Sequence, residues 1–299
     1  MRITPALALP ASLANVQSSS FTSAQDGLSV AGFEWPATVD QVRGVVQIAH
    51  GLAEHSARYA RLAAALNAAG YHVGSTDHRG HGASIAGTPG DFGAAGFTGL
   101  WHDVVQYGDL LRDAHPGVPV YLIAHSMGSF AAQELLPEYS ERYDGVVLSG
   151  STAIDVMAAQ MDSGPASDLS VFNSAFENRT GYEWLSRDEE EVDAYVADPL
   201  CGFALPAETT PALFADGARL ADPAELARIR SDLPILIISG SDDPLSGGGR
   251  LTGLLAKRYT DAGIADVTVI VYPDARHEVF NETNRDEVTG DVIAWLQAH

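Results

Sequence analysis

Short, unbroken apolar runs alternate along this chain with segments of helical periodicity. The runs cover residues 44–49, 71–75, 118–124, 146–148, 234–240 and 267–272. A strand without alternation of apolar and polar residues is buried on both faces, which is typical of a parallel sheet covered by helices on either side. The sequence therefore predicts an α/β fold with a mostly parallel central sheet, preceded by two strands at residues 19–24 and 28–35 that flank the turn Asp26-Gly27.

The alternation stops for a long stretch in the middle of the chain. Residues 151–230 are acidic and poor in strand patterns, and they carry the run Asp188-Glu189-Glu190-Glu191. A stretch of this length is too long for an ordinary loop. We therefore expect a single α/β core, formed by residues 1–150 and 231–299, that is interrupted by a helical cap at residues 151–230.

The segment Val120-Tyr121-Leu122-Ile123-Ala124-His125-Ser126-Met127-Gly128 predicts a buried strand, a sharp turn and a helix, with Ser126 at the apex. This is the pattern of the nucleophile elbow of α/β-hydrolases, written G-x-S-x-G, in which a strained turn exposes the serine hydroxyl. Gly128 matches the second glycine, and Ala124 replaces the first with the next smallest residue. The alternative is an ordinary serine at a helix N-terminus. The strand before it favours a nucleophile.

A serine needs a base to take its proton and a carboxylate to orient that base. In this fold both follow later strands, in the order serine, acid, histidine. His277 follows the run 267–272, and it is the only histidine between Ser126 and the terminal His299. Two adjacent acids, Asp242 and Asp243, follow the run 234–240 and compete for the third role, although Asp242 is also suited to cap the turn.

An oxyanion hole requires two backbone N–H groups aimed at the developing negative charge. One is expected from Met127, directly after the nucleophile. The other is expected from Leu52, in the loop His50-Gly51-Leu52-Ala53-Glu54-His55 that follows the run 44–49.

The charge of the chain excludes several classes of partner. The formal net charge is −22, whereas nucleic-acid binding needs clustered lysine and arginine. The same charge disfavours docking on anionic membranes, and no apolar run reaches the ~18 residues of a membrane-spanning helix. We expect a solvated acidic surface, no nucleic-acid partner and no stable membrane insertion. The sequence does not predict the oligomeric state.

Cysteine usage and the N-terminus bear on location. Cys201 is the single cysteine, so no intrachain disulfide forms, and it is interpreted as a small buried apolar residue. Residues 1–14 are mildly signal-like, but Pro5 and Pro10 interrupt them. We expect a cytoplasmic protein, with secretion as a minor alternative.

Three histidines, His72, His78 and His81, lie close enough in sequence to raise the question of a metal site. No cysteine or well-spaced carboxylate completes a ligand set, and His78 and His81 lie in a glycine-rich loop, which favours structural hydrogen bonds. The acidic run near Glu189 lacks the spacing of a calcium loop. We expect no metal and no cofactor.

Several motifs together resemble those of a known family. They are residues 50–59 (HGLAEHSARY), 77–84 (DHRGHGAS), 125–128 (HSMG), 184–188 (WLSRD), 197–203 (ADPLCGF) and 276–278 (RHE). These resemble the monoacylglycerol lipase and lysophospholipase-like group of α/β-hydrolases, whose bacterial members share the family that also takes the name serine aminopeptidase. The resemblance implies a triad of Ser126, Asp243 and His277, oxyanion donors at Leu52 and Met127, and a cap that shapes the acyl pocket. Ala124 and Ser129 depart from the glycines common at those positions.

The expected activity is hydrolysis of a carboxylic ester through an acyl-enzyme on Ser126, without a cofactor. The partner would be a small-molecule ester with an apolar acyl chain: a monoacylglycerol, another short or medium acyl ester, or a lysophospholipid. Apolar cap residues are candidates for the acyl pocket and equally for the cap core: Val171, Phe172, Phe176, Trp184, Phe203, Leu213 and Phe214. Amide or peptide hydrolysis and a non-catalytic small-ligand binder are the alternatives. Ser126 excludes chemistry that needs a carboxylate nucleophile at the elbow.

Overall fold

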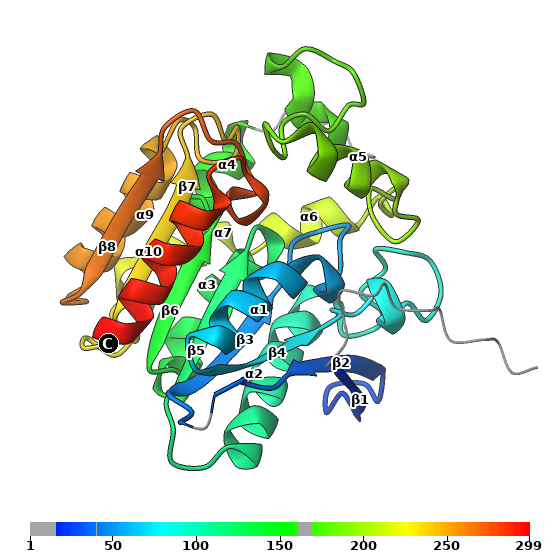
Figure 1. Ribbon diagram of the computed structural model, residues 1–299. Helices are drawn as coiled ribbons and strands as arrows, with labels where there is room; N and C mark the ends of the chain where they lie inside the picture. Colours follow the sequence, from blue (N-terminus) through cyan, green and yellow to red (C-terminus); the bar gives the residue numbers. More distant parts are fainter. Residues whose placement is uncertain (1–15, 40, 161–168) are drawn as a thin grey trace, which may run out of the picture.

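One sheet of eight strands organises the part of the chain that the computed structural model describes, residues 16–39, 41–160 and 169–299. The strands are β1 (Gln17–Thr22), β2 (Ser29–Trp35), β3 (Gly44–Ala49), β4 (Tyr71–Thr76), β5 (Val120–His125), β6 (Gly145–Ser149), β7 (Ile235–Gly240) and β8 (Val267–Tyr272). Their spatial order is β1-β2-β4-β3-β5-β6-β7-β8, as Figure 1 shows. β1 and β2 pair antiparallel and every pairing from β4 to β8 is parallel, which confirms the predicted mostly parallel sheet.

The apolar runs become strands because burial on both faces suits them. Every residue of β3, β5 and β7 is buried. β8 differs, because it is the last strand in the order and its outer neighbour is missing: Val269 is 37% and Val271 36% exposed. An edge strand tolerates such exposure, and the sequence pattern alone does not tell an edge strand from a central one.

Helices cover both faces of the sheet. One buried cluster joins α1 (Ala60–Ala68) and α10 (Arg285–Ala298) to the sheet, and the other joins α2 (Gly96–Ala114), α3 (Met127–Tyr139) and α9 (Arg250–Asp261). A 3₁₀ turn, Ser56–Tyr59, leads directly into α1. Loops at the carboxyl ends of the parallel strands therefore meet at one edge between these layers.

Residues 151–230, here called the cap segment, connect β6 to β7. Their described part contains a 3₁₀ helix, Leu169–Ala175, and five helices: α4 (Ile154–Gln160), α5 (Glu189–Ala197), α6 (Thr209–Phe214), α7 (Gly217–Leu220) and α8 (Pro223–Leu226). Figure 1 shows α4 and α5 at the end of the sheet where the loops after β7 and β8 also lie. Apolar cap side chains such as Trp184 and Leu213 belong to the same buried cluster as β5 and α3. The division into core and cap domains stays a prediction.

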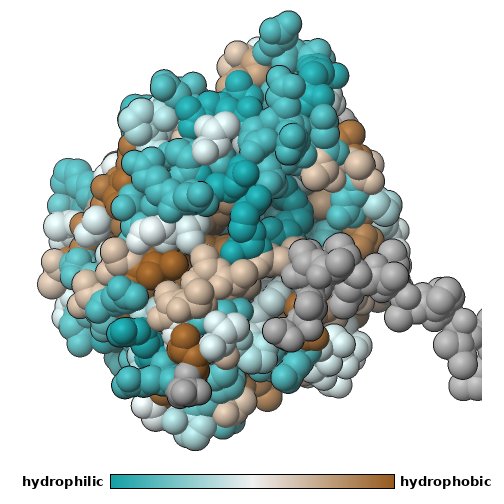
Figure 2. Space-filling model, in the orientation of Figure 1, coloured by the Kyte–Doolittle hydropathy of each residue, from teal (hydrophilic) through white to brown (hydrophobic). Residues whose placement is uncertain are grey.

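The surface is predominantly polar. In the view of Figure 2 hydrophilic residues cover most of the upper part of the molecule, and apolar residues occur in small separated groups. None of the described helices combines the length and the hydropathy that crossing a bilayer requires. The signal-like residues 1–14 lie outside the described residues.

Candidate active site

Ser126 occupies the turn between β5 and α3 in a backbone conformation that non-glycine residues rarely adopt. Its φ is 51° and its ψ −119°. Such a residue costs of the order of 1–3 kcal/mol and persists only when the surroundings hold it. Here the Ser126 N–H donates to the Ser149 carbonyl at 2.9 Å, and its own carbonyl accepts the N–H of Phe130 at 3.1 Å. The local backbone is therefore the strained strand–turn–helix that the sequence predicts.

The two small residues of the elbow differ in how much space is available for a side chain. A Cβ on Gly128 would overlap the carbonyl group of Ala49, because α3 packs directly on the end of β3. Ala124 is fully buried in β5, where its partners in the neighbouring strands are Ala49 and Leu148. The first elbow position thus accommodates one methyl group, whereas the second requires glycine.

His277 and Asp243 form a buried pair. His277 Nδ1 lies 3.0 Å from Asp243 Oδ1, and the residues are 2% and 1% exposed. The same carboxylate oxygen accepts the N–H of Leu245 at 2.9 Å, which fixes its orientation. Burial lowers the pKa of His277, but the negative charge of Asp243 and its hydrogen bond outweigh burial, so the pKa is raised overall.

His277 and Ser126 line the same cavity. Among the described residues, His277 Nε2 is buried without a hydrogen-bond partner. Because Asp243 holds Nδ1, Nε2 is the atom left to take a proton. Buried polar atoms without partners are rare, and this one belongs to a residue that lines the cavity over Ser126.

Asp242 has a different environment from its neighbour. It is exposed, and its carboxylate accepts from the Ser241 hydroxyl at 3.2 Å. A Cβ on Gly240 would overlap the Ala275 carbonyl, so glycine allows the loops after β7 and β8 to lie against each other. Asp243, and not Asp242, is the carboxylate that contacts His277.

The loop after β3, residues 50–55, is held in place by hydrogen bonds from two of its N–H groups. The Gly51 N–H donates to Glu54 Oε1 at 2.5 Å, and the Ala53 N–H donates to His81 Nε2 at 3.1 Å. Ala53 adopts a φ of 55°, a second strained non-glycine residue. Within the described parts of the chain the Leu52 N–H has no acceptor, and neither has the Met127 N–H at the start of α3. The two expected oxyanion donors are thus free.

The sequence did not indicate the ionic network beside this loop. Arg58 binds Glu54 at 2.8 Å and both oxygens of Glu278, at 2.5 and 2.8 Å. It therefore joins the loop after β3 to the residue that follows His277. Burial raises the pKa of Glu54, but the charges of Arg58 and of nearby histidines outweigh burial and lower it to about 2. Glu54, Arg58 and Glu278 lie inside recognised motifs, yet spacing gave no reason to pair them.

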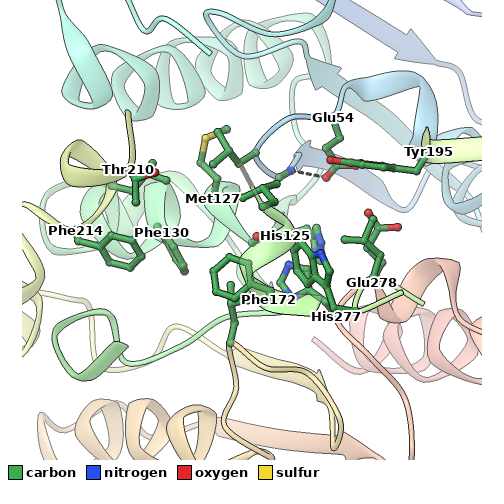
Figure 3. A pocket seen from close by; sticks show the side chains of 18 residues that line it. Glu54, His125, Met127, Phe130, Phe172, Tyr195, Thr210, Phe214, His277 and Glu278 are labelled. Carbon is green, nitrogen blue, oxygen red and sulfur yellow. Dashed lines mark hydrogen bonds between the residues drawn. The ribbon is translucent and has the colours of Figure 1, made fainter. Parts of the chain in front are cut away.

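The cavity over Ser126 has an apolar end and a polar end. It encloses about 630 Å³, part of it open to solvent. In Figure 3 Phe130, Phe214 and Phe172 gather on one side, Glu54, Tyr195 and Glu278 on the other, with His277 between them. His125, which sequence reasoning had not assigned, also lines the cavity; burial and His277 lower its pKa to about 4, so it stays neutral. Tyr195 comes from α5, a segment without a recognisable motif.

The histidines considered for a metal do not come together. His72 stacks on His115 with ring centroids 4.3 Å apart, whereas His78 and His81 lie 4.1 and 5.3 Å from His50. His81 accepts the Ala53 N–H, a structural role of the kind expected. The acidic run begins α5, where Asp188 caps the helix and Glu191 pairs with Arg61.

Comparison with known proteins adds relatives to this geometry. The family of hydrolases described as serine aminopeptidase, S33, matches residues 40–284. A monoacylglycerol lipase of Mycolicibacterium smegmatis is 32% identical over 86% of this chain and 89% of its own length, and the human monoglyceride lipase is 30% identical over 84% and 80%. The crystal structure of a carboxyl esterase from Bacillus coagulans superposes with a TM-score of 0.83, at 26% identity over 95% of this chain and 98% of that one.

Proposed function

The chain belongs to the serine aminopeptidase, S33, family of α/β-hydrolases and is related within it to the monoacylglycerol lipases, and from that premise we propose that it hydrolyses monoacylglycerol-type carboxylic esters through an acyl-enzyme on Ser126. The observation that carries this proposal is the buried His277–Asp243 pair: His277 lines the same cavity as the strained Ser126, and its Nε2 has no partner among the described residues.

The reaction follows from the roles of the three side chains. His277 Nε2 takes the hydroxyl proton as Ser126 Oγ attacks the ester carbonyl, and Asp243 stabilises the imidazolium that forms. His277 then gives that proton to the leaving alcohol, which departs as the acyl-enzyme forms. Water, deprotonated by the same nitrogen, attacks the acyl-enzyme; the acid leaves and the proton returns to Ser126.

The oxyanion of each tetrahedral intermediate would lie between the N–H groups of Leu52 and Met127. Both groups lack an acceptor among the described residues, and a Cβ on Gly51 would lie 3.2 Å from the Ser126 Cβ, so the loop is next to the nucleophile. Donors fixed before the reaction stabilise the charge without reorganising, which is worth about 3–4 kcal/mol per donor.

The two ends of the cavity match the two ends of a monoacylglycerol. Phe130, Phe172 and Phe214 provide an apolar wall for the acyl chain. Glu54, Tyr195 and Glu278 provide polar atoms on the opposite side, where a glycerol leaving group would be released (Figure 3). Most of this wall comes from residues 151–230, so the cap would set the chain length. The partner is a small-molecule ester.

We propose a cytoplasmic location, because a chain with one cysteine forms no intrachain disulfide that would need an oxidising compartment.

Amide hydrolysis is a second candidate because the family description includes aminopeptidases. An aminopeptidase needs a carboxylate free to bind the substrate ammonium group. The two acidic groups of the cavity, Glu54 and Glu278, already share Arg58. Neither carboxylate is therefore without a partner for its oxygens, which favours esters.

A substrate panel tests the proposal. p-Nitrophenyl esters of two to sixteen carbons, monoacylglycerols and aminoacyl p-nitroanilides would be compared on the wild type and on Ser126→Ala. We expect hydrolysis of esters and monoacylglycerols, none of anilides, and a fluorophosphonate adduct on Ser126. An adduct on another residue, or cleavage of anilides at rates similar to esters, would overturn the proposal.

A further inference from the structure

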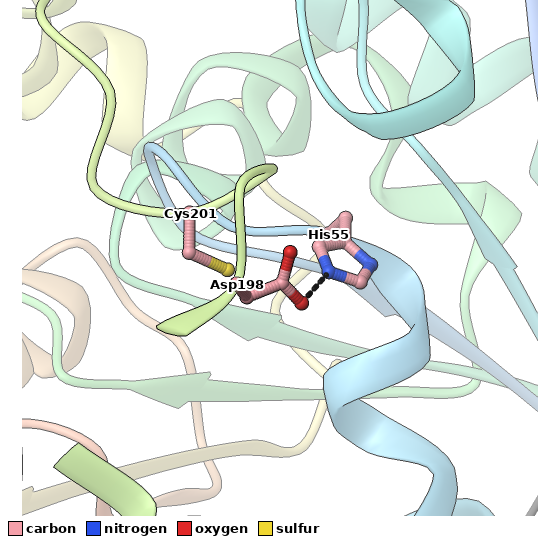
Figure 4. Close-up of side chains that lie close together, drawn as sticks. All are labelled: His55, Asp198 and Cys201. Carbon is pink, nitrogen blue, oxygen red and sulfur yellow. Dashed lines mark hydrogen bonds and ion pairs between the residues drawn. The ribbon is translucent and has the colours of Figure 1, made fainter. Parts of the chain in front are cut away.

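Three potential metal ligands meet at the junction between the cap segment and the loop after β3. His55, Asp198 and Cys201, here called the junction cluster, place one ligand atom each within 4.8 Å of the other two. His55 Nε2 lies 3.0 Å from Asp198 Oδ2, and Figure 4 shows the Cys201 sulfur beside that pair. The catalytic proposal uses none of the three.

The turn after α5 presents two of these ligands from one side. The Cys201 N–H donates to the Asp198 carbonyl at 3.0 Å, so Asp-Pro-Leu-Cys closes on itself. The Leu200 N–H holds Asp198 Oδ1 at 2.8 Å, and Oδ2 is the oxygen that faces His55. This spacing, two ligands separated by two residues, is the one by which paired cysteines hold zinc. A carboxylate with one oxygen held by a hydrogen bond and the other left for the ion is common in metal sites.

The donor set selects the ion. Thiolate and imidazole suit Zn²⁺, whereas Mg²⁺ and Ca²⁺ prefer oxygen alone. Tetrahedral Zn²⁺ separates its ligand atoms by about 3.5 Å. The cluster lies within roughly an ångström of that spacing, since its pairs range from 3.0 Å to at most 4.8 Å.

Burial and charge also fit a cation. The His55 and Asp198 side chains are 10% and 31% exposed and Cys201 is 8% exposed, so the site is enclosed but keeps a solvent-facing side for a fourth ligand, water. The positive charge of Arg58 lies nearby, but the two negative charges of Glu54 and Glu278 exceed it. The net charge of −22 concentrates cations around the whole molecule.

We propose that the junction cluster is a Zn²⁺ site that fastens the cap segment to the core. His55 Nε2, Asp198 Oδ2 and Cys201 Sγ bind the ion, the thiol proton passes to solvent, and water completes the tetrahedron. Beside the site the Gly202 N–H donates to the Ala53 carbonyl at 3.0 Å, so the ion would hold the cap against the loop that carries Leu52.

The test uses the full-length protein without a histidine tag, treated with a chelator and then titrated with Zn²⁺ or Co²⁺. In competition with a chromophoric chelator, we expect each chain to bind one Zn²⁺. Co²⁺ should produce thiolate-to-cobalt charge-transfer absorption, which only Cys201 can supply because the chain has a single cysteine. Zn²⁺ at 100 times its Kd should raise the Tm by about 4 °C.

Matched variants separate this site from adventitious binding. Cys201→Ser should abolish the charge-transfer band and weaken Zn²⁺ binding at least tenfold, and Asp198→Asn should also weaken it tenfold. His299→Gln is the control, because His299 pairs with Asp266 at the same 3.0 Å but has no cysteine beside it. The proposal fails if Co²⁺ gives no thiolate band, or if Cys201→Ser, with an unchanged metal-free Tm, binds Zn²⁺ as tightly as the wild type.

Discussion

The hydroxyl of Tyr195, on α5 of the cap segment, donates a 2.9 Å hydrogen bond to the carbonyl oxygen of Ala53. Ala53 follows Leu52, the proposed oxyanion donor, and its strained φ of 55° requires support. The cap therefore contacts the backbone of the oxyanion loop directly, in addition to covering the cavity.

Tyr195→Phe removes this bond, and a short ester without a glycerol group avoids the second effect, the loss of a hydroxyl at the polar end of the cavity. Losing a hydrogen bond of this kind costs about 0.5–1.5 kcal/mol. We expect kcat for a short ester to fall about 3–10-fold with little change in KM, because the oxyanion matters only in the transition state. Tyr143→Phe is the control: it loses a buried bond to Gln47, remote from the site. Equal losses of kcat in both variants would refute a specific role for Tyr195.

Two substitutions of Ser126 separate catalysis from strain. Both Ser126→Ala and Ser126→Gly should lower kcat at least about 10⁴-fold, since each removes the nucleophile. At φ 51° glycine is unstrained and alanine is not. Ser126→Gly should therefore be about 1 kcal/mol more stable than Ser126→Ala in urea unfolding. The reverse order would show that this turn stores no strain in solution.

The adjacent aspartates provide a matched pair. Asp243→Asn should lower kcat about 10⁴-fold, because an amide cannot stabilise the imidazolium and favours the wrong tautomer. Asp242→Asn should leave kcat within twofold of the wild type, since that carboxylate is exposed and bonded to Ser241. Steady-state kinetics on one p-nitrophenyl ester decides between them, and a large loss in Asp242→Asn would contradict the assignment.

The pH dependence of activity should report the ionisation of His277, the proposed base. This residue must be neutral to accept a proton, and its pKa is raised above the ordinary 6.5. The rate should thus rise with pH and reach half its maximum above pH 6.5. The stability of the fold depends on pH in the opposite direction. A pKa that is higher in the folded than in the unfolded state stabilises the fold. This contribution is complete below the unfolded pKa and is lost as the pH rises through the folded pKa. A profile of kcat/KM that levels off below pH 6 would exclude this.

Filling the apolar end of the cavity should shorten the preferred acyl chain. Phe214 lines that end and is half-buried, so Phe214→Trp adds volume without disrupting the buried core. We expect the ratio of kcat/KM for a twelve-carbon ester to that for a two-carbon ester to fall at least about tenfold, or ~1.4 kcal/mol. Phe176→Trp is the control, because Phe176 stacks on Arg276 and does not line the cavity. An unchanged ratio in Phe214→Trp would place the acyl chain elsewhere.

The features that could be predicted from the sequence are those encoded within a few residues. Continuous apolar runs predicted the parallel sheet, and one nine-residue segment predicted the strand–turn–helix at Ser126. The edge position of β8 was not predictable, because it depends on strand order. Spacing could not choose between Asp242 and Asp243, since both follow β7 and the choice depends on how the loop after that strand folds.

The contacts of the cap were beyond sequence reasoning for a related reason. Tyr195 lies in a segment without strand or helix periodicity strong enough to orient it. Arg58 and Glu278 are 220 residues apart in the chain, and nothing local marks them as partners. The same holds for His55 and Asp198, which are separated by 143 residues.

The cap segment also holds the loop after β8, which carries the proposed base: the N–H groups of His277 and Glu278 donate to the carbonyls of Trp184 and Leu185, at 3.2 and 2.8 Å. Engineers who transplant caps between relatives to change their substrates would therefore exchange part of the machinery. A chimera that kept its own loops under a foreign cap would start with a loosened base and oxyanion hole. Productive exchange needs the loops after β3 and β8 to move together with the cap.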